Sequence, residues 1–253
     1  MNSHAPDRGG LALLFEPRTR PTLHDIAAVL AQGAGTDGGI AISHRPDPRD
    51  GWVELLCRGL TFDLAGLAPG QGEPWPEVAY DYDLPGACDV MQGEVLTLTV
   101  GQHLAGGGHL LPVVRAQMEV ALGLLALPGL RAVVWQPAAI AMSAGHFSRV
   151  LSPWLNGGPF PALGLTYLTR SADGTMVSHG LSFFTGQELS LAPMPGRADA
   201  DLGKLAVRLI HKLVDSAPIE TPCDIIGPDG EVLFIEPVEN GHRLRVGGRV
   251  LSD

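Results

Sequence analysis

The residues Thr175–Leu191 read TMVSHGLSFFTGQELSL and decide how the second half of the chain folds. Polar and apolar residues alternate in Thr175–Phe184, and they alternate again in Pro161–Thr169, which predicts two strands. The pair Asp173–Gly174 lies between them and is a strong signal for a tight hairpin turn. Glu188–Leu191 predicts a third, short strand. We therefore expect an antiparallel hairpin with one added strand.

Most of this stretch has the composition of a scaffold. Gly180 and Gly186 would allow bends or a close approach of two backbones. Leu181, Phe184 and Leu189 are expected to face a core. These five residues indicate architecture more than chemistry.

Glu188 is the exception, because a carboxylate among apolar neighbours needs a partner. We expect that partner to be an arginine, or the free backbone amides of a helix that begins at Asp199. The favoured interpretation is that Glu188 braces the fold, since structural ion pairs perturb carboxylates just as catalytic sites do. A catalytic role for Glu188 is the alternative.

The same stretch resembles the pattern of a bacterial family known only as a domain of unknown function, number four-two-six-one. In that family a Gly-Leu pair, an aromatic residue, a glycine and a Glu-Leu pair close two strands before a helix. The matching positions are Gly180, Leu181, Phe184, Gly186, Glu188 and Leu189. Upstream, an apolar helix ending at Pro128–Gly129, the run Ala132–Trp135 and Trp154 also resemble the family's central segment. The resemblance covers roughly residues 90–215 and implies no established activity, cofactor or catalytic residue.

Further toward the C-terminus, Asp199–Ser216 predicts an amphipathic helix. The residues of its apolar face are Leu202, Leu205, Ala206, Leu209 and Leu213. Asp224–Val250 predicts a β meander, with turns at Pro228–Gly230 and Asn240–Gly241.

The first half of the chain alternates between strands and helices. One helix is expected to begin after Thr22, whose hydroxyl suits an N-cap with Asp25 three residues on. A nearly all-apolar helix is expected at Leu110–Leu127, and Ser143 is expected to cap a third helix that ends near Leu151. The expected strands are Leu11–Phe15, Gly39–Ser43, Trp52–Cys57, Leu60–Leu64, Gly93–Val100 and Leu130–Trp135.

This order of elements predicts the α+β class, with antiparallel or mixed sheets, helices packed on one face, and split βαβ (ferredoxin-like) units. Residues 1–152 and 153–253 are expected to form two lobes, because prolines and glycines cluster at residues 153–161. A single continuous sheet is the alternative. Segment 65–89 is rich in proline and glycine and is long for a loop inside one compact domain.

The charge of the chain excludes several partners. Its 253 residues include 27 acids and 17 bases, and Lys204 and Lys212 are its only lysines. Nucleic acids and anionic membrane surfaces bind clustered basic residues, so neither is expected as a partner.

No run of ~18 apolar residues predicts a membrane span, and Met1–Gly10 lacks the features of a secretory signal. We expect a cytoplasmic protein.

Acidic residues concentrate in one stretch whose single base is Arg58. They are Asp50, Glu54, Asp63, Glu73, Glu77, Asp81, Asp83, Asp89 and Glu94. One interpretation is a solvated face that aids solubility, and the sharper one is a docking surface for a basic protein partner. Asp81 and Asp83 would share a face in a strand and raise one another's pKa, but they would be solvated in a loop.

Motifs for catalysis and metal binding are weak. Residues 33–38 (GAGTDG) match a dinucleotide fingerprint, but a helix precedes them and a strand follows, which is the reverse of that motif's context. Gly101–His109 suits anion binding in its order of elements but lacks the ending of a nucleotide P-loop. Cys57, Cys88 and Cys223 form no CxxC pair and are expected to be reduced thiols. No cofactor or metal is expected, since no two histidines have a metal-binding spacing.

Two hypotheses about function remain. The favoured one is a non-enzymatic protein-interaction module, of immunity or adaptor type, that meets a basic partner with its acidic 50–94 segment. The alternative is a small-molecule enzyme or sensor whose pocket lies between the two lobes and is lined by Glu188, His179, His109 and Trp135.

Overall fold

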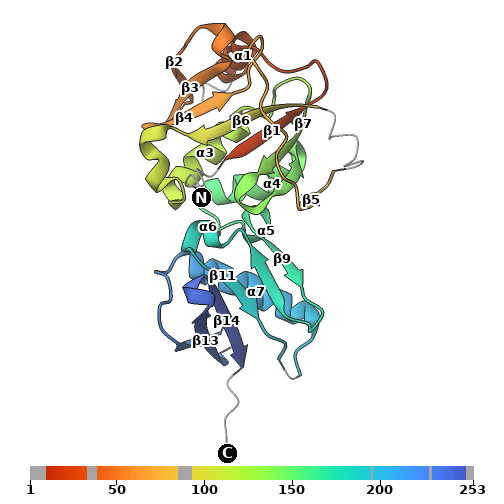
Figure 1. The fold of residues 1–253 in the computed structure, drawn as a ribbon, viewed down its shortest axis with the longest axis vertical. Helices are drawn as coiled ribbons and strands as arrows, with labels where there is room; N and C mark the ends of the chain where they lie inside the picture. Colours follow the sequence, from red (N-terminus) through yellow and green to blue (C-terminus); the bar gives the residue numbers. More distant parts are fainter. Residues whose placement is uncertain (1–9, 33–38, 85–92, 195, 228–229, 249–253) are drawn as a thin grey trace, which may run out of the picture. The chain divides into compact units, whose positions relative to one another are not determined.

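A computed structural model describes residues 10–32, 39–84, 93–194, 196–227 and 230–248. The chain divides into two compact units, residues 1–158 and 159–253, whose elements are labelled in Figure 1. Some features considered above lie outside the described residues, namely the GAGTDG run at 33–38, Cys88, Asp89 and the turn residues 228–229. The prediction of two lobes with a boundary near residue 153 stays a prediction.

The first unit contains an eight-stranded sheet in the order β2-β3-β4-β6-β1-β7-β8-β5. Its strands are β1 (Leu11–Phe15), β2 (Ala41–His44), β3 (Trp52–Cys57), β4 (Leu60–Ala65), β5 (Tyr80–Tyr82), β6 (Glu94–Val100), β7 (Leu130–Trp135) and β8 (Ile140–Ser143). Every neighbouring pair is antiparallel except β5 and β8, which are parallel. The class is therefore α+β with mostly antiparallel pairing, as the sequence predicts.

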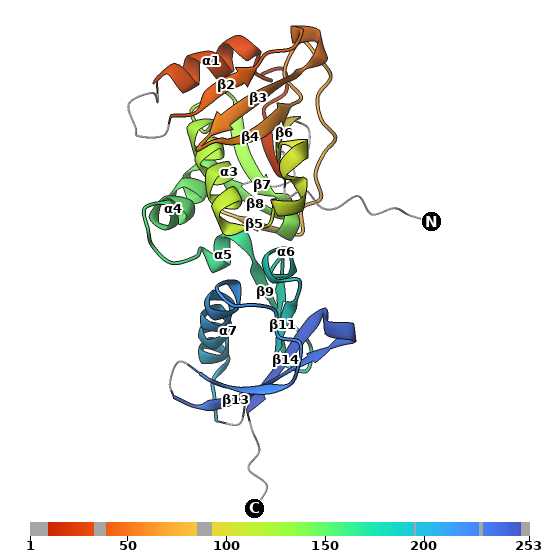
Figure 2. The ribbon, with the colours of Figure 1, turned by 90° about the vertical axis from the view of Figure 1, so that its left-hand side faces the viewer.

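Helices α3 (Leu111–Gly123) and α4 (Ala144–Leu155) cover one face of this sheet (Figure 2). Helix α3 contacts β3, β4 and β6, and α4 contacts β7 and β8. Ser143 caps α4 as expected, because its hydroxyl accepts a hydrogen bond from the amide of His146 at 3.1 Å. Each helix thus buries its apolar side on one half of the sheet.

Helix α1 (Leu23–Gln32) begins at the predicted cap. Asp25 accepts hydrogen bonds from the amide and the hydroxyl of Thr22, at 2.8 and 2.7 Å. The amide of Asp25 in turn donates to the Thr22 hydroxyl at 3.4 Å. This reciprocal pairing satisfies amides that the first turn of a helix leaves without partners.

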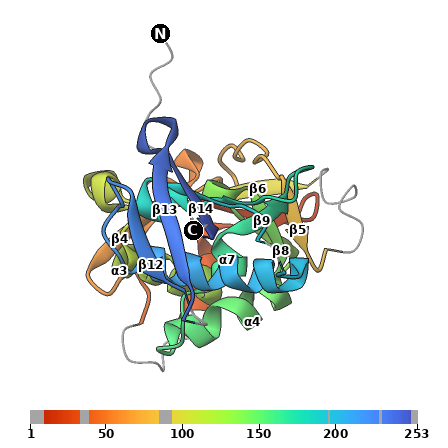
Figure 3. The same ribbon diagram turned by 90° about the horizontal axis from the view of Figure 1, so that it is seen from below.

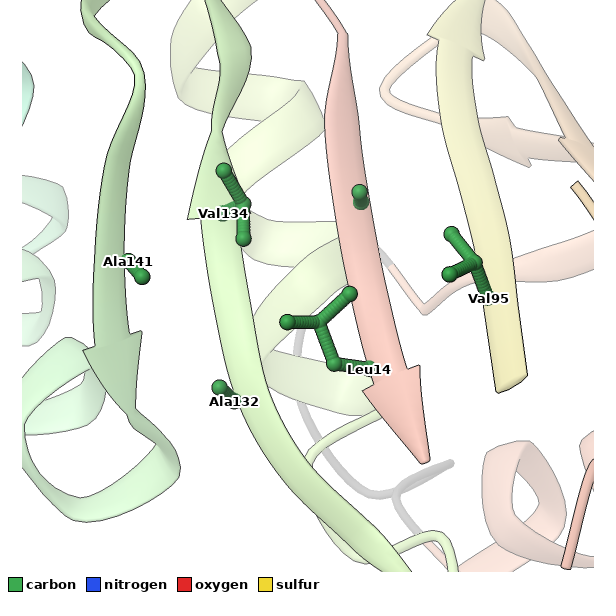
Figure 4. Close-up of a cluster of buried hydrophobic side chains, with 6 residues drawn as sticks. Leu14, Val95, Ala132, Val134 and Ala141 are labelled. Carbon is green, nitrogen blue, oxygen red and sulfur yellow. The ribbon is translucent and has the colours of Figure 1, made fainter. Parts of the chain in front are cut away.

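Part of the long irregular segment covers the opposite face of the sheet. Trp75 and Leu84 pack against a buried cluster on β1, β6, β7 and β8. Figure 4 shows the side chains of this cluster. The cluster consists of Ala12, Leu14, Val95, Ala132, Val134 and Ala141. Three of these six residues are alanines, and the large indole of Trp75 packs against the cluster that they help to form. The segment from 66 to 84 is a structural layer, although it contains one short strand, β5.

Backbone hydrogen bonds attach this covering segment to the sheet and its surroundings. The amides of Leu67, Glu73 and Ala79 donate to the carbonyls of Gly51, Val95 and Ala139, at 2.8 to 3.0 Å. These contacts supply the backbone partners that a segment outside regular secondary structure needs when it covers a core.

The second unit has a six-stranded sheet in the order β12-β13-β14-β11-β10-β9. Its strands are β9 (Tyr167–Arg170), β10 (Met176–His179), β11 (Glu188–Leu191), β12 (Cys223–Ile226), β13 (Val232–Val238) and β14 (Arg243–Gly248). Strands β11 and β14 are parallel, and the other neighbours are antiparallel. The predicted hairpin is confirmed as β9–β10, and the C-terminal meander as β12–β14.

Helix α7 (Asp199–Val214) packs against β10 and β11. Figure 3 shows this helix along its length. All five residues of its predicted apolar face are buried, together with Ile210. They meet the buried side of the sheet, which includes Leu189, Leu191, Leu244 and Val246. This confirms the amphipathic helix.

Two expected strands are shorter than predicted. Pro161–Thr169 begins with a helical turn, α5 (Ala162–Leu165), before β9. Thr175–Phe184 leaves the sheet at Gly180, whose φ of 87° is left-handed, and continues as the turn α6 (Ser182–Thr185). Alternation of side chains misled the prediction, because short apolar turns and short strands share that pattern.

The sequence also missed β5 and β8, and its finer description of the fold is unconfirmed. The described residues also contain 3₁₀ turns at Pro48–Asp50, Gln102–Gly107, Gln136–Ala138 and Glu239–Gly241. The ferredoxin-like units stay a prediction. Among the described residues, no helix has both the length and the apolar character needed to cross a membrane.

The first prediction concerns Trp75. We expect Trp75→Ala to lower the free energy of unfolding by about 2 kcal/mol, less than a fully buried tryptophan costs, because the side chain is half-buried. Urea unfolding followed by far-UV circular dichroism measures the change. Leu110→Ala, at a side chain that is 51% exposed, is the control. Equal midpoints for the two variants would show that the indole is not part of the core.

Candidate functional site

The Glu188 carboxylate, at the start of β11, is surrounded by hydrogen-bond donors. Its Oε1 accepts from the amides of Gly180 and Ser182, at 2.8 and 3.0 Å, and from the Ser182 hydroxyl at 2.7 Å. Its Oε2 accepts from the Ser178 hydroxyl at 2.5 Å. Hydrogen bonds to an ionised acceptor are stronger than those between neutral groups.

The local sequence explains this geometry. Gly180 turns the chain out of β10 with a positive φ, which presents two amides toward β11. Gly186 ends α6 in the left-handed region, and the chain returns to the sheet at Glu188. The hydroxyl of Ser178 also accepts from the amide of Leu189 at 2.7 Å. Hydrogen bonds therefore join the two ends of the motif, residues 178–182 and 188–189.

The prediction that an arginine or the amides of the Asp199 helix bind Glu188 was wrong. No arginine and no amide of the Asp199 helix contributes to the four hydrogen bonds described for this carboxylate, which come from residues 178–182. A carboxylate in this position could act as a base only after releasing several of these donors. The geometry therefore favours the structural interpretation of Glu188 over the catalytic one.

The other residues of the expected pocket also have separate environments. His179 Nε2 lies 2.7 Å from the Thr169 hydroxyl, and the His179 ring stacks on Tyr167 with centroids 4.5 Å apart. His109 is exposed before α3, and Trp135 is fully buried in β7. His179 and Glu188 belong to the second unit, whereas His109 and Trp135 belong to the first.

Sequence reasoning missed Gln187, which is 5% exposed. Its side-chain amide donates to the carbonyls of Ile219 and Gly241, at 3.0 and 2.8 Å, and its Oε1 accepts from the amide of Ile219 at 2.9 Å. Gln187 thus joins three distant segments of the second unit. No pattern in the sequence distinguishes it from a surface glutamine.

The acidic stretch does not form one surface. Glu94 pairs with Arg20, and Glu54 accepts a hydrogen bond from Ser43 at 2.7 Å. Between residues 77 and 83, however, exposed groups follow one another along an extended segment. Its exposed residues are Glu77, Val78, Ala79, Tyr80, Asp81 and Asp83. Val78 and Tyr80 are each 41% exposed, which places apolar surface among the carboxylates.

Asp81 and Asp83 diverge within this segment. Asp81 lies in β5, the last strand of the sheet, and its side chain is exposed. Asp83 follows the strand with a positive φ of 57°, and it accepts hydrogen bonds from Ser143 and Arg149 at 3.3 and 3.4 Å. The two carboxylates are therefore not arranged as the shared-face pair that a longer strand would produce.

A cluster that the sequence did not predict lies beside Asp83. The ring of His146, on α4, stacks on Tyr82 with centroids 5.0 Å apart and planes 3° from parallel. Burial, together with the nearby Arg149, lowers the pKa of His146. The capping motif at Ser143 places His146 and Arg149 on the first turns of α4, but nothing in the sequence indicates that Tyr82 and Asp83 meet them.

Cys57 lies beside an ion pair between strand and helix. The Arg58 guanidinium donates to both carboxylate oxygens of Glu119, each at 2.6 Å, and Cys57 Sγ lies 3.5 Å from one of them. Burial and the Glu119 charge raise the pKa of Cys57 to about 11. The Cys57 thiol is buried in the core, and Cys223 is half-buried.

The remaining candidates are the glycine-rich segment and the possible metal ligands. Gln102–Gly107, in the glycine-rich segment, forms a 3₁₀ turn, and α3 then begins without a side-chain cap. Across the described parts of the chain, no three His, Cys, Asp or Glu residues group together in a way that could hold a metal ion.

Comparison with known proteins gives this chain no relative. No family model, no curated protein and no solved structure matches it. The resemblance to the domain of unknown function stays a prediction.

We predict that Glu188→Ala lowers the free energy of unfolding of the second unit by about 2 kcal/mol, because the buried donors of Ser178 and Gly180 lose their acceptor. All four tryptophans lie in residues 1–158, so far-UV circular dichroism, and not tryptophan fluorescence, must follow the second unit. Glu188→Gln, which keeps an acceptor oxygen, is expected to cost less. Glu220→Ala, an exposed residue of the same unit, is the control. A midpoint like that of the control would contradict the brace.

We also predict that Cys57 resists alkylation in the folded protein. With a pKa of about 11, roughly one Cys57 in a thousand is a thiolate at pH ~8, and only the thiolate reacts. Iodoacetamide followed by peptide mass spectrometry should modify Cys223 first. Labelling in urea is the control, since both thiols are then accessible. Equal rates in the folded state would contradict this account.

Proposed function

We propose that this chain is a non-enzymatic protein-interaction module, of immunity or adaptor type, that docks a basic protein partner. The observation that carries the proposal is the exposed segment 77–83, where carboxylates alternate with exposed Val78 and Tyr80. We call residues 77–83 the β5 edge. Charges at a surface steer a partner of opposite sign, and apolar side chains between them supply the contact area.

The position of this segment supports the proposal. Strand β5 is the end of the eight-stranded order, and its pairing with β8 leaves its other side without a neighbouring strand in the described chain. Asp81 pairs in register with Ala141, whereas Tyr80 pairs with Ile140. Tyr80 and Asp81 therefore point to opposite faces of the edge, so a partner there would meet an aromatic group on one face and an acidic group on the other.

We further propose that the chain is a distant member of the bacterial family that it resembles, and that it acts in the cytoplasm. Five of the six motif residues support this membership because each of the five has a defined role in one turn. Gly180 and Gly186 adopt left-handed conformations, Leu181 and Leu189 are buried, and Glu188 binds the turn. A turn of this kind would require the same residue types in any relative.

The enzyme or sensor alternative has weaker support. Glu188 and His179 each have partners within the second unit, and Trp135 is fully buried in the first unit. No observation favours that hypothesis over the interaction module.

A synthetic peptide of alternating lysine and valine tests the docking surface. We expect it to bind at about 0.1 M salt and to dissociate at about 1 M, because screening shortens the reach of surface charges. The double variant Glu77→Gln, Asp81→Asn should weaken binding about fivefold, since each exposed pair contributes ~0.2–1 kcal/mol. Fluorescence anisotropy of the labelled peptide measures the dissociation constant.

The matched control neutralises two exposed acids of the second unit, Asp215→Asn and Glu220→Gln. It changes the net charge by the same amount and should leave binding as in the wild type. A peptide of alternating glutamate and valine should not bind. Two results would overturn the β5 edge as the docking surface. One is an equal loss of affinity in both double variants, which would attribute the effect to net charge alone, and the other is binding of the glutamate–valine peptide.

A further inference from the structure

The contact between β5 and α4 is built around one imidazole. His146 stacks on Tyr82, which in turn contacts Tyr80 with ring centroids 4.9 Å apart. The Arg149 side chain lies 3.2 Å from Nδ1 of His146 and 3.4 Å from the carboxylate of Asp83. Arg149 thus stands between an imidazole of its own helix and an acid of the β5 edge.

The chemistry of Arg149 determines the protonation state of His146 in this arrangement. A guanidinium has donors only and stays charged at any ordinary pH. Nδ1 of His146 must therefore accept the hydrogen bond, so the ring is neutral and carries its proton on Nε2. A second proton on Nδ1 would remove the acceptor and place two cations 3.2 Å apart.

We propose that His146 is a proton-sensitive latch that holds the β5 edge against α4, and that protonation of His146 releases Tyr82 and Asp83. This inference rests on the proposed function, because the β5 edge is the proposed docking surface. Protonation would weaken docking of a basic partner in two ways. It would loosen the preorganised edge, and it would add a positive charge beside Asp83.

The groups that face His146 support this direction. Tyr82 packs on the ring, Arg149 approaches it from the same helix, and Asp83 lies beyond Arg149. Burial and Arg149 lower the pKa of His146, and Asp83 opposes them. Since the folded pKa lies below the ordinary value of about 6.5, the closed contact is favoured above that pH. Its stabilisation is lost as the pH falls below about 6.5, because the open form binds the proton more readily.

Proton nuclear magnetic resonance of the imidazole C–H groups tests the latch itself. His146 should titrate below the ordinary histidine value in the wild type. Arg149→Met removes the facing cation and should raise that pKa. The titration would count against the latch if His146 had an ordinary or raised pKa in the wild type, or if Arg149→Met left it unchanged.

Hydrogen exchange of the peptide that spans residues 77–84 reports release of the edge. His146→Phe keeps an aromatic ring on Tyr82 but cannot be protonated, so it serves as the reference at each pH. Between about pH 7.5 and 5.5, the wild type should lose protection relative to His146→Phe. His24→Gln removes an exposed histidine from α1 and should behave as the wild type does. Equal pH dependence in the wild type and His146→Phe would overturn the latch.

The lysine–valine peptide separates this inference from the proposed function. We expect its affinity for the wild type to fall roughly fivefold over the same pH range, at the lower end of coupling between linked equilibria. His146→Phe retains every carboxylate and should show a smaller loss. Salt-sensitive binding with equal pH dependence in both proteins would support the function and overturn its regulation. Release of the edge without any peptide binding would support the latch and contradict the docking function.

Discussion

Strand β1 sets the main constraint on the first unit, because none of its five residues reaches solvent. A strand buried on both faces needs a cover on each side. Helices α3 and α4 provide one cover, and the irregular segment with Trp75 provides the other. The same segment contains the β5 edge, so the residues proposed for docking lie between Trp75 and Leu84, which both pack on the core.

In the second unit the main constraint is that a carboxylate, that of Glu188, lies beside the hydrophobic core and needs hydrogen-bond donors. Glu188 satisfies its carboxylate with amides and hydroxyls from the adjoining turn. The buried amide of Gln187 joins the neighbouring segments in the same way. The side chains of Glu188 and Gln187 therefore specify how the turn and the strands meet. Their role is structural, although groups of this kind can also form a binding or catalytic site.

The proposed function depends on exposed acidic residues and not on the acids that stabilise the fold. Glu94, Glu119 and Glu188 are engaged in contacts within their own units, whereas Glu77 and Asp81 extend from an exposed edge beside apolar side chains. The engaged acids stabilise the fold, and the exposed acids are available to a partner. His146 connects the β5 edge to the core, because its ring packs on Tyr82 of the edge strand while its helix, α4, covers the sheet.

The sequence by itself determined the α+β class, the caps at Thr22 and Ser143, and the amphipathic helix α7, because periodicity and capping depend on residues close together in the chain. Only the tertiary structure decided which donors hold Glu188, since a positive φ at Gly180 turned an expected strand into a turn. It also decided that Trp75 packs against the buried cluster of the first sheet, and that Tyr82 meets His146. Tyr82 and His146 are 64 positions apart in the chain, and no local pattern records which distant surfaces have complementary shape.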